Sequence, residues 1–339
     1  GGLTMDGTEV GSAEAWDPVT QRFETVGSMM QPRFEHRASL LDDGRVLITG
    51  GAVRQDPEGT RPDGEGPFRL ATAELWVPAS GTFESTGTLA VARDGHTSTT
   101  LADGRVLIVG GVMDDADAPT EVWNPADGVF ESLGPPITER LYGHTATLLE
   151  DGGVLLVGGR DSSFADLAAV ELWDSQTESF ETAGSLEQGR SFHAAARLAD
   201  GRVLIAGGSG VDEAGMPDLL DSAVVWDPTT DTILAVAPLA VGRATHLISA
   251  LPDGRALVTG GTGFADAGAA ADPGVGPSVL ADVETFEPAG DAFEQGGSLA
   301  SGRMGHTATS LPDGRVLVLG GLDVAGQVIS DAEVWAPSS

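Results

Sequence analysis

One motif is repeated six times along the chain, and it constrains the fold more than any other feature. Each copy contains an Arg, a His, an apolar run, Asp-Gly, a second apolar run and then Gly-Gly. The six copies end at Gly51, Gly111, Gly159, Gly208, Gly261 and Gly321. A repeat of roughly 50 residues predicts modules that stack in a row or around a circle, because each module is too small to bury its own apolar face.

The pattern within each copy has the period of β-strands. Asp-Gly between two apolar runs favours a tight hairpin, since both residues tolerate a positive φ. The second run, such as residues 105–109, is apolar on both faces, as expected for a strand buried between sheets. A third strand ends in an aromatic residue, and this position holds all the tryptophans: Trp16, Trp76, Trp123, Trp173, Trp226 and Trp335. A fourth strand carries a Phe, or Ile233 in one copy, so each unit has four strands.

Four short strands, Gly-Gly after the second and an aromatic-Asp-Pro turn after the third resemble the kelch repeat. The resemblance covers essentially the whole chain and implies an all-β fold, a kelch-type β-propeller with one four-stranded blade per repeat. Residues 1–339 then form a single propeller domain. We expect complete blades at about residues 33–88, 93–135, 140–186, 190–238 and 243–298, and a closure blade made from residues 304–336 and 13–26.

Six blades, with the ring closed by strands from both termini, is the favoured arrangement because closure removes exposed sheet edges. Six blades need only six copies of the third strand of the repeat, so one copy, around Trp16 or Trp335, is then redundant. It could lie outside its sheet or pair with another copy of the chain, which gives a route to self-assembly through a terminal strand. Seven blades, with an inner pair of strands lost before Gly1, is the alternative.

Composition limits the partners of the chain. All 18 basic residues are Arg, and the net charge is −33. Such a surface repels phosphate backbones and anionic membranes, so we expect no nucleic-acid partner. No apolar run approaches the ~20 residues of a membrane span, so no membrane insertion is expected. The chain starts at Gly1–Gly2 rather than Met, which favours a processed protein that is extracellular or at the cell surface.

Two residue series accompany the repeat and look functional. The histidines at the start of the first strands are His36, His96, His144, His193, His246 and His306. We expect them, like the tryptophans, to be structural, because ligands spread around a channel cannot share one metal ion. The arginines that precede them are Arg33, Arg93, Arg140, Arg190, Arg243 and Arg303. They could ring one mouth of the channel and bind a carboxylate or phosphate, or they could clamp backbone carbonyls.

The loops that follow Gly-Gly differ between copies and are therefore a better guide to function. Phe68 and Phe264, on the two longest loops, are candidate ligand-binding residues, and Phe164 and Met216 are further candidates for stacking on a ligand. A dense acidic group is the candidate calcium site, although its spacing matches no known calcium loop. Its residues are Asp114, Asp115 and Asp117. Calcium is the one candidate cofactor.

The dominance of the repeat and the lack of a catalytic motif favour a non-catalytic extracellular module for binding or assembly. It would recognise a glycan or a protein through the variable loops. The alternative is a carbohydrate-active enzyme, similar to sialic-acid epimerases or to lyases, that uses the arginine ring. Galactose oxidase has a similar architecture, but its chemistry needs two tyrosines and a cysteine. This chain has only Tyr142 and no cysteine, so we assign no catalytic residue.

Overall fold

The computed structural model describes residues 1–54, 67–113, 119–211, 215–264 and 276–337. The chain divides into two compact units, and each is described by itself. The first unit contains Gly1–Tyr142 and Gln176–Ser179, and the second contains Gly143–Ser175 and Phe180–Ser339. All regular elements of the described residues are β-strands. No helix long and apolar enough to cross a membrane occurs among these residues.

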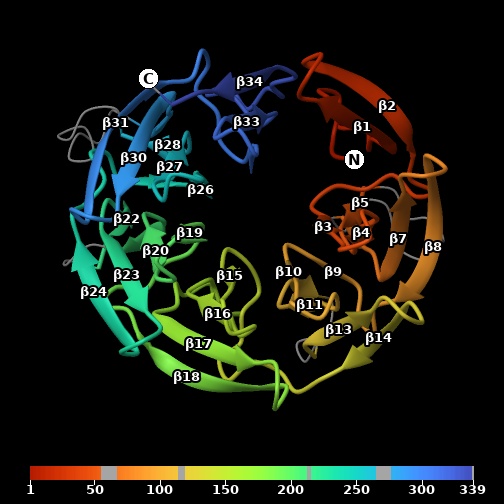
Figure 1. The fold of residues 1–339 in the computed structure, drawn as a ribbon, viewed down its shortest axis with the longest axis horizontal. Helices are drawn as coiled ribbons and strands as arrows, with labels where there is room; N and C mark the ends of the chain where they lie inside the picture. Colours follow the sequence, from red (N-terminus) through yellow and green to blue (C-terminus); the bar gives the residue numbers. More distant parts are fainter. Residues whose placement is uncertain (55–66, 114–118, 212–214, 265–275, 338–339) are drawn as a thin grey trace. The chain divides into compact units, whose positions relative to one another are not determined.

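Beside short strand pairs around its loops, the first unit contains, among its described residues, two four-stranded antiparallel sheets and one longer two-stranded sheet (Figure 1). The four-stranded sheets are β3 (Arg37–Leu40), β4 (Val46–Thr49), β7 (Thr72–Val77) and β8 (Thr82–Thr88), followed by β10 (Thr97–Thr100), β11 (Val106–Val109), β13 (Glu121–Asn124) and β14 (Val129–Ser132). The two-stranded sheet pairs β1 (Ser12–Asp17) with β2 (Arg22–Ser28). It thus contains only the third and fourth strands of a repeat.

Beside short strand pairings around its loops, the second unit contains, among its described residues, three four-stranded sheets and one longer three-stranded sheet, again antiparallel and in chain order. The strands of the first two are β15 (Thr145–Leu148), β16 (Val154–Val157), β17 (Ala169–Asp174) and β18 (Ser179–Ser185), then β19 (Ala194–Arg197), β20 (Val203–Ala206), β23 (Ala223–Asp227) and β24 (Thr232–Val236). Those of the last two are β26 (Leu247–Ala250), β27 (Ala256–Thr259), β30 (Asp282–Glu287) and β31 (Ala292–Ser298), then β32 (Thr307–Ser310), β33 (Val316–Leu319) and β34 (Ala332–Trp335).

The strands in the loops that follow Gly-Gly are short, and they pair with one another or with the segment that begins a repeat. They are β5 (Ala52–Val53) with β6 (Phe68–Arg69), β9 (Arg93–Asp94) with β12 (Val112–Met113), β21 (Ser209–Val211) with β22 (Pro217–Leu219), and β25 (Arg243–Ala244) with β28 (Thr262–Gly263) and β29 (Ser278–Val279). β9 and β25 contain the arginine that begins a repeat, and their partners β12 and β28 follow the Gly-Gly of that same repeat. These two pairings therefore join their loops to the regular part of the fold.

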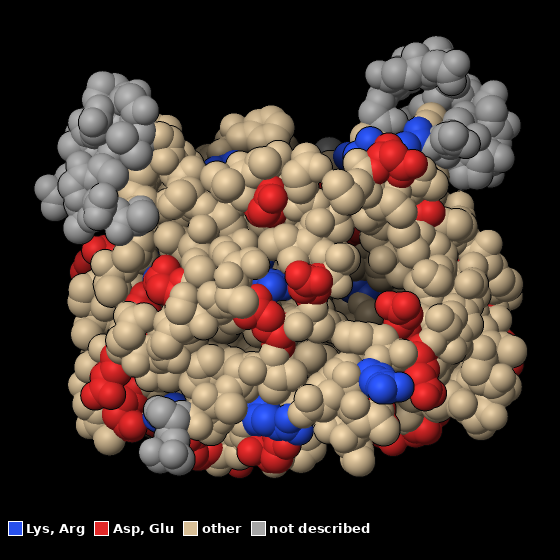
Figure 2. All heavy atoms as spheres, turned by 90° about the horizontal axis from the view of Figure 1, so that it is seen from above, with Lys and Arg blue, Asp and Glu red and all other residues tan. Residues whose placement is uncertain are grey.

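The hairpins form where Asp-Gly predicts them. Gly44 has φ 85°, and Asp43 accepts hydrogen bonds from both the backbone amide and the Nε of Arg45, at 3.0 and 2.8 Å. Arg105, Arg202, Arg255 and Arg315 pair with the aspartate of their own turn in the same way. These arginines therefore fix the hairpins locally. Acidic side chains otherwise occur in small groups across the visible face and form no single patch (Figure 2).

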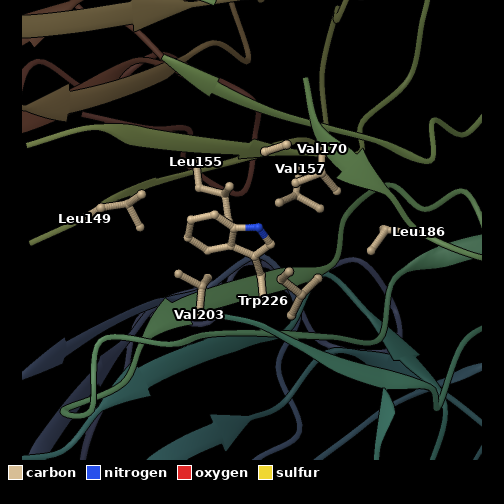
Figure 3. Close-up of a cluster of buried hydrophobic side chains, with 9 residues drawn as sticks. Leu149, Leu155, Val157, Val170, Leu186, Val203 and Trp226 are labelled. Atoms are coloured by element: carbon tan, nitrogen blue, oxygen red, sulfur yellow. The ribbon is translucent and has the colours of Figure 1, made fainter. Parts of the chain in front are cut away.

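The core consists of apolar layers between neighbouring sheets. In the second unit, Trp226 of β23 lies among Leu155, Val157 and Val170 of the preceding sheet (Figure 3). Ile233 pairs with Trp226 in register, so it occupies the place of the expected phenylalanine. Because the second strand of each sheet contacts neighbours on both faces, strands such as β20 are buried along their whole length. This packing explains why the second apolar run of each repeat lacks alternation.

The all-β class and the four-stranded antiparallel unit agree with the sequence analysis. Five sheets have all four strands, within the ranges expected for the five complete blades. The two incomplete sheets, β1–β2 and β32–β34, have the strands that the sequence predicts for the two ends of the chain. They belong to different units and are separate sheets. The number of blades and the closure of a ring stay predictions.

Candidate functional site

The arginines that begin the repeats are buried inside the fold rather than exposed on it. All six expose at most 2% of their surface: Arg33, Arg93, Arg140, Arg190, Arg243 and Arg303. Arg33, for example, donates from NH1 to the carbonyl oxygens of Gly50 and Thr72, at 2.8 and 2.9 Å, and from NH2 to Glu74 Oε1 at 2.8 Å. A ligand could reach such a guanidinium only by displacing these partners.

Glutamates complete the clamps of Arg33, Arg93, Arg243 and Arg303. Arg93 pairs with Glu121 at 2.7 Å and Arg243 with Glu284 at 2.6 Å, and Arg303 also pairs with Glu333. The second carboxylate oxygen accepts a backbone amide of the preceding repeat, as Glu284 Oε2 does from Ala240 at 2.9 Å. Burial raises the pKa of both Glu121 and Glu284, and the facing arginines act against that shift. The clamp therefore connects successive sheets.

The histidines connect neighbouring sheets as well. His96 Nε2 lies 2.8 Å from Thr49 Oγ1 of the preceding sheet, and His306 Nε2 lies 2.9 Å from Thr259 Oγ1. Burial lowers the pKa of His246 to about 3 and that of His306 to about 4, with nearby arginines adding to the effect. His246 and His306 are therefore neutral at neutral pH, and only His306 of the two has a threonine partner among the described residues.

This burial predicts that the second unit loses stability as the pH falls. Because the folded-state pKa lies below the unfolded value of about 6.5, only the unfolded state takes up protons between about pH 6.5 and 4. Each of these two histidines should then lower the free energy of unfolding by about 2 kcal/mol at pH 5. Urea unfolding at pH 7 and pH 5 measures the loss. His246→Gln should reduce the pH dependence, and an unchanged dependence would contradict this account.

A cavity among the variable loops of the second unit is the strongest candidate site. Its volume is about 420 Å³, which is within the range of small-molecule sites. It is lined by Arg160, Phe164, Asp166, Ser209, Gly210, Val211, Pro217, Asp218, Leu219, Thr262, Phe264 and Pro277. Two carboxylates, one guanidinium and two phenyl rings therefore share one small space. Such a mixture of apolar walls and a few polar groups is typical of a binding or catalytic pocket.

The loop from Arg160 to Asp166 places Phe164 in this cavity with a strained backbone. Phe164 has φ 63°, in the left-handed region that a bulky residue rarely adopts, and is 66% exposed. Asp161 shapes the turn by accepting hydrogen bonds from the amides of Ser163 and Ala165, at 2.8 and 3.0 Å. The Ser163 hydroxyl also donates to Asp161 at 2.6 Å, and this bond, together with the two amide bonds, lowers the pKa of Asp161 below its usual value.

Two other loops in the chain have the same form and show what is unusual about Phe164. Each is closed by a bridge across seven residues, Leu3 to Glu9 in one and Leu322 to Val328 in the other. The left-handed position is Gly7, with φ 81°, and Gly326, with φ 71°. Glycine adopts this conformation without strain, whereas a phenyl-bearing residue costs about 1–2 kcal/mol. Backbone strain of this kind is concentrated at functional sites.

Asp166 is held firmly on one side and open on the other. Its Oδ1 accepts from Arg160 Nε at 2.8 Å and from Ser191 Oγ at 2.5 Å. Arg160 is itself stacked over the ring of Phe192, with Cζ 5.5 Å from the ring centroid. Among the described residues, Asp166 Oδ2 has no hydrogen-bond partner. One oxygen is therefore available to a ligand while the other fixes the orientation of the carboxylate.

The structure brings together only part of the predicted site. Phe264 and Phe164 line the cavity, whereas Phe68 lies in the first unit on β6 and pairs with Val53. The candidate calcium ligands Asp114, Asp115 and Asp117 lie outside the described residues. Met216 is exposed and is not among the residues that line the cavity.

Asp166, Arg160 and Ser191 are the residues that the sequence reasoning missed. The signal that could have found them is the alignment of the three seven-residue loops, since Phe164 replaces a glycine in that alignment. Asp218 is the other carboxylate of the cavity. Its Oδ1 accepts from the amide of Leu219 at 2.8 Å, which fixes it on β22.

No protein-family model matches this sequence, and neither does any curated protein. Among solved structures, the fold is similar to a fungal alcohol oxidase of the AA5 family determined in complex with copper. The TM-score is 0.73 at 17% identity, over 99% of this chain and 69% of that chain. It is also similar to YjhT, with a TM-score of 0.61 at 17% identity, over 89% of this chain and 94% of that one. These likenesses support a β-propeller-like all-β fold.

The residues present do not fit the copper of that oxidase. Among the residues that the structure describes, no group of three or more His, Cys, Asp or Glu side chains is placed to hold a metal ion. The Nε2 atoms of His96 and His306 face threonine hydroxyls instead. We therefore derive no step that uses copper.

The comparison corrects the functional prediction. The expected non-catalytic module for binding or assembly is wrong, because a structure that resembles the whole chain is an alcohol oxidase, which is an enzyme. The alternative, a carbohydrate-active enzyme, is closer to this finding, although the likeness is one of fold. The arginine ring assigned to that alternative is buried in structural clamps, so the loop cavity is the better location for its site.

Proposed function

We propose that this chain is a carbohydrate-active enzyme that acts on a neutral sugar or polyol in the loop cavity of its second unit. The observation that carries the proposal is the cavity itself, where the carboxylates of Asp166 and Asp218 lie with the rings of Phe164 and Phe264. Two carboxylates in one pocket are the usual machinery for proton transfer in sugar chemistry.

Asp166 is the proposed general base. Arg160 and Ser191 fix its Oδ1, so Oδ2 can accept a proton from a substrate hydroxyl or from an acidic C–H bond. Asp218 is the proposed acid that returns a proton to the substrate. Proton abstraction and return are common to epimerisation, elimination and hydrolysis. Transfer of a proton to Asp166 and from Asp218 is therefore the proposed chemistry, whichever of the three reactions takes place.

The substrate class follows from charge and shape. The chain has a net charge of −33, and two aspartates line the cavity, so a polyanionic substrate would be repelled. Phenyl rings offer flat apolar surfaces for the C–H face of a sugar ring. Arg160, Ser209 and Thr262 add polar groups among the lining residues. A neutral compound rich in hydroxyl groups matches both features.

The test is a turnover screen with a panel of neutral monosaccharides, disaccharides and polyols. Products, anomers and epimers are detected by chromatography and by proton NMR. We expect one structural class to be converted with saturable kinetics. Absence of turnover across the panel at high enzyme concentration would contradict the proposal.

Replacing the strained phenylalanine separates function from stability. We expect Phe164→Gly to lower kcat/KM about 10-fold or more, because the substrate loses an apolar contact. The free energy of unfolding should not fall by more than about 0.5 kcal/mol, since relief of the left-handed strain offsets the lost packing and the added chain entropy. Steady-state kinetics and urea unfolding measure the two effects.

The matched control for this variant is Gly326→Phe, which puts a phenylalanine at the same position of an equivalent loop. No heavy atom lies within 4 Å of a Cβ built there, so the first atom of the new side chain meets no obstacle. We expect a loss of about 1–2 kcal/mol of stability from backbone strain, with unchanged turnover. If Phe164→Gly instead destabilises the chain and leaves turnover intact, Phe164 is a packing residue.

We also propose that the fold belongs to the kelch type and has seven blade positions, one of them occupied by β1 and β2 alone. The support is that β2 lies against β8 as β8 lies against β14. In addition, Gly2 donates to the carbonyl of Arg33 at 2.8 Å, and Gly51 donates to the carbonyl of Arg93 at 2.9 Å in the same way. A crystal structure of the chain would count the blades directly.

A further inference from the structure

Arg190 differs from other arginines of its series because it has no carboxylate partner among the described residues. Arg33, Arg93, Arg243 and Arg303 each pair with a glutamate two residues before the aromatic of the third strand. In the sheet of Arg190 this position is Val224. Val224 pairs in register with Ile205 just as Glu284 pairs with Val258. Val224 therefore occupies the same position of the repeat as the glutamates, and the strand is not shifted.

The donors that the missing glutamate would satisfy are still present. Arg190 NH1 donates to the carbonyls of Gly207 and Ser222, both at 3.0 Å, and NH2 donates to Ser222 Oγ at 3.0 Å. In the other sheets the glutamate accepts from NH2, as Glu284 does from Arg243 at 2.6 Å. In the equivalent sheet, the backbone amide of Ala240 donates a hydrogen bond to Glu284. The corresponding amide here is that of Glu187, and it has no acceptor among the described residues.

The cost of this arrangement is electrostatic. Arg190 exposes 2% of its surface, and burial lowers its pKa to about 10 without a carboxylate to oppose the shift. A buried charge without an opposite charge costs several kcal/mol. An anion bound beside it would remove much of this cost.

A cavity lies where the glutamate is missing. It has a volume of about 470 Å³ and is lined by Arg190 and Ser222 together with apolar side chains that include Leu186, Val224 and Ile233. Ile233 stands where most repeats have a larger phenylalanine, which adds to the space. None of the residues that line the loop cavity lines this one.

We propose that this cavity binds a small monocarboxylate, whose carboxylate group takes the position that glutamate occupies in the other sheets. The carboxylate accepts hydrogen bonds from Arg190 NH2 and from the amide of Glu187. The body of the ligand contacts Leu186, Val224 and Ile233, so an apolar body is favoured. Exposed Glu187 and Asp221 also line the cavity and disfavour a second negative charge. This ligand site goes beyond the proposed enzyme function and does not depend on it.

The test uses thermal unfolding of the full chain at constant ionic strength, with butyrate as the apolar probe and butyramide as its uncharged control. Glucuronate tests whether a sugar acid is the better source of the carboxylate. Two variants accompany the wild type. Val224→Glu supplies a carboxylate from the chain itself, and Val224→Gln fills the same space without a charge.

We expect saturating butyrate to raise the Tm of the wild type by about 3 °C or more, and butyramide to leave it unchanged. Val224→Glu should raise the Tm by a similar amount without ligand and should abolish the response to butyrate. Val224→Gln should not raise the Tm. A larger shift with glucuronate would support the carboxylate site and assign its ligand to sugar acids.

Two results would overturn the proposal. One is a wild type that responds equally to butyrate and butyramide, or to neither carboxylate. The other is a Val224→Glu variant that responds to butyrate as the wild type does, or that is no more stable than Val224→Gln. Turnover of a neutral sugar in the loop cavity should be the same in all three proteins, so failure here is distinguishable from failure of the enzyme proposal.

Discussion

Asp166→Asn should lower the kcat of the sugar-directed activity by a factor of about 100 to 10,000. The amide has nearly the same size as the carboxylate, and its oxygen can still accept hydrogen bonds from Arg160 and Ser191. It cannot accept a proton at neutral pH, so only the chemical step is lost. KM should change less than about threefold, because the shape of the cavity is preserved. Steady-state kinetics on the sugar found in the screen measure both constants.

The control for Asp166→Asn is Asp253→Asn, on an Asp-Gly turn of the same unit. Asp253 pairs with Arg255 at 2.7 Å and is not among the residues that line the cavity. Its replacement should leave both kinetic constants unchanged. If Asp166→Asn keeps the wild-type kcat, Asp166 is not the base.

Glu121→Ala should destabilise the first unit by about 3–5 kcal/mol. Arg93 and Glu121 expose 0% and 1% of their side chains, so the variant leaves a buried guanidinium without its carboxylate. It also leaves the amide of Ala90 without the oxygen that accepts it at 2.8 Å. Urea unfolding followed by tryptophan fluorescence measures the loss, because Trp123 is on the same strand.

Two further proteins separate burial from charge in this prediction. Asp313→Asn removes the charge from an exposed pair with Arg315 and should cost far less stability than Glu121→Ala. The double variant Arg93→Met with Glu121→Leu replaces the buried pair with apolar side chains and should recover much of the stability. Equal losses in Glu121→Ala and Asp313→Asn would show that the clamp contributes no more than a surface pair.

Local chemistry explains why much of the fold can be predicted from the sequence. Asp-Gly at Asp43–Gly44 determines a hairpin, because few other dipeptides adopt its backbone conformation so easily. Gly50 has φ 57°, and a Cβ there would lie 2.5 Å from the carbonyl oxygen of Arg93. These constraints act within a few residues or recur in each repeat, so they are visible in a single sequence.

The candidate site was less predictable because it depends on contacts between repeats. Ser191 belongs to one repeat and Asp166 to the loop before it, and their contact follows from how two sheets pack. The strain at Phe164 appears only when its loop is compared with the loops that contain Gly7 and Gly326. The repeated arginines looked like a ligand site in the sequence, but they are buried in structural clamps. A charged residue that recurs in each repeat can be structural as well as functional.

The most direct test of the enzyme proposal is a crystal structure of the Asp166→Asn variant with its converted sugar bound. We expect the sugar in the loop cavity, with a hydroxyl group or the reacting carbon beside the side chain at position 166. One face of the sugar ring should lie on Phe164 or Phe264. A sugar bound outside this cavity, while the wild type turns the same sugar over, would contradict the assignment of the site.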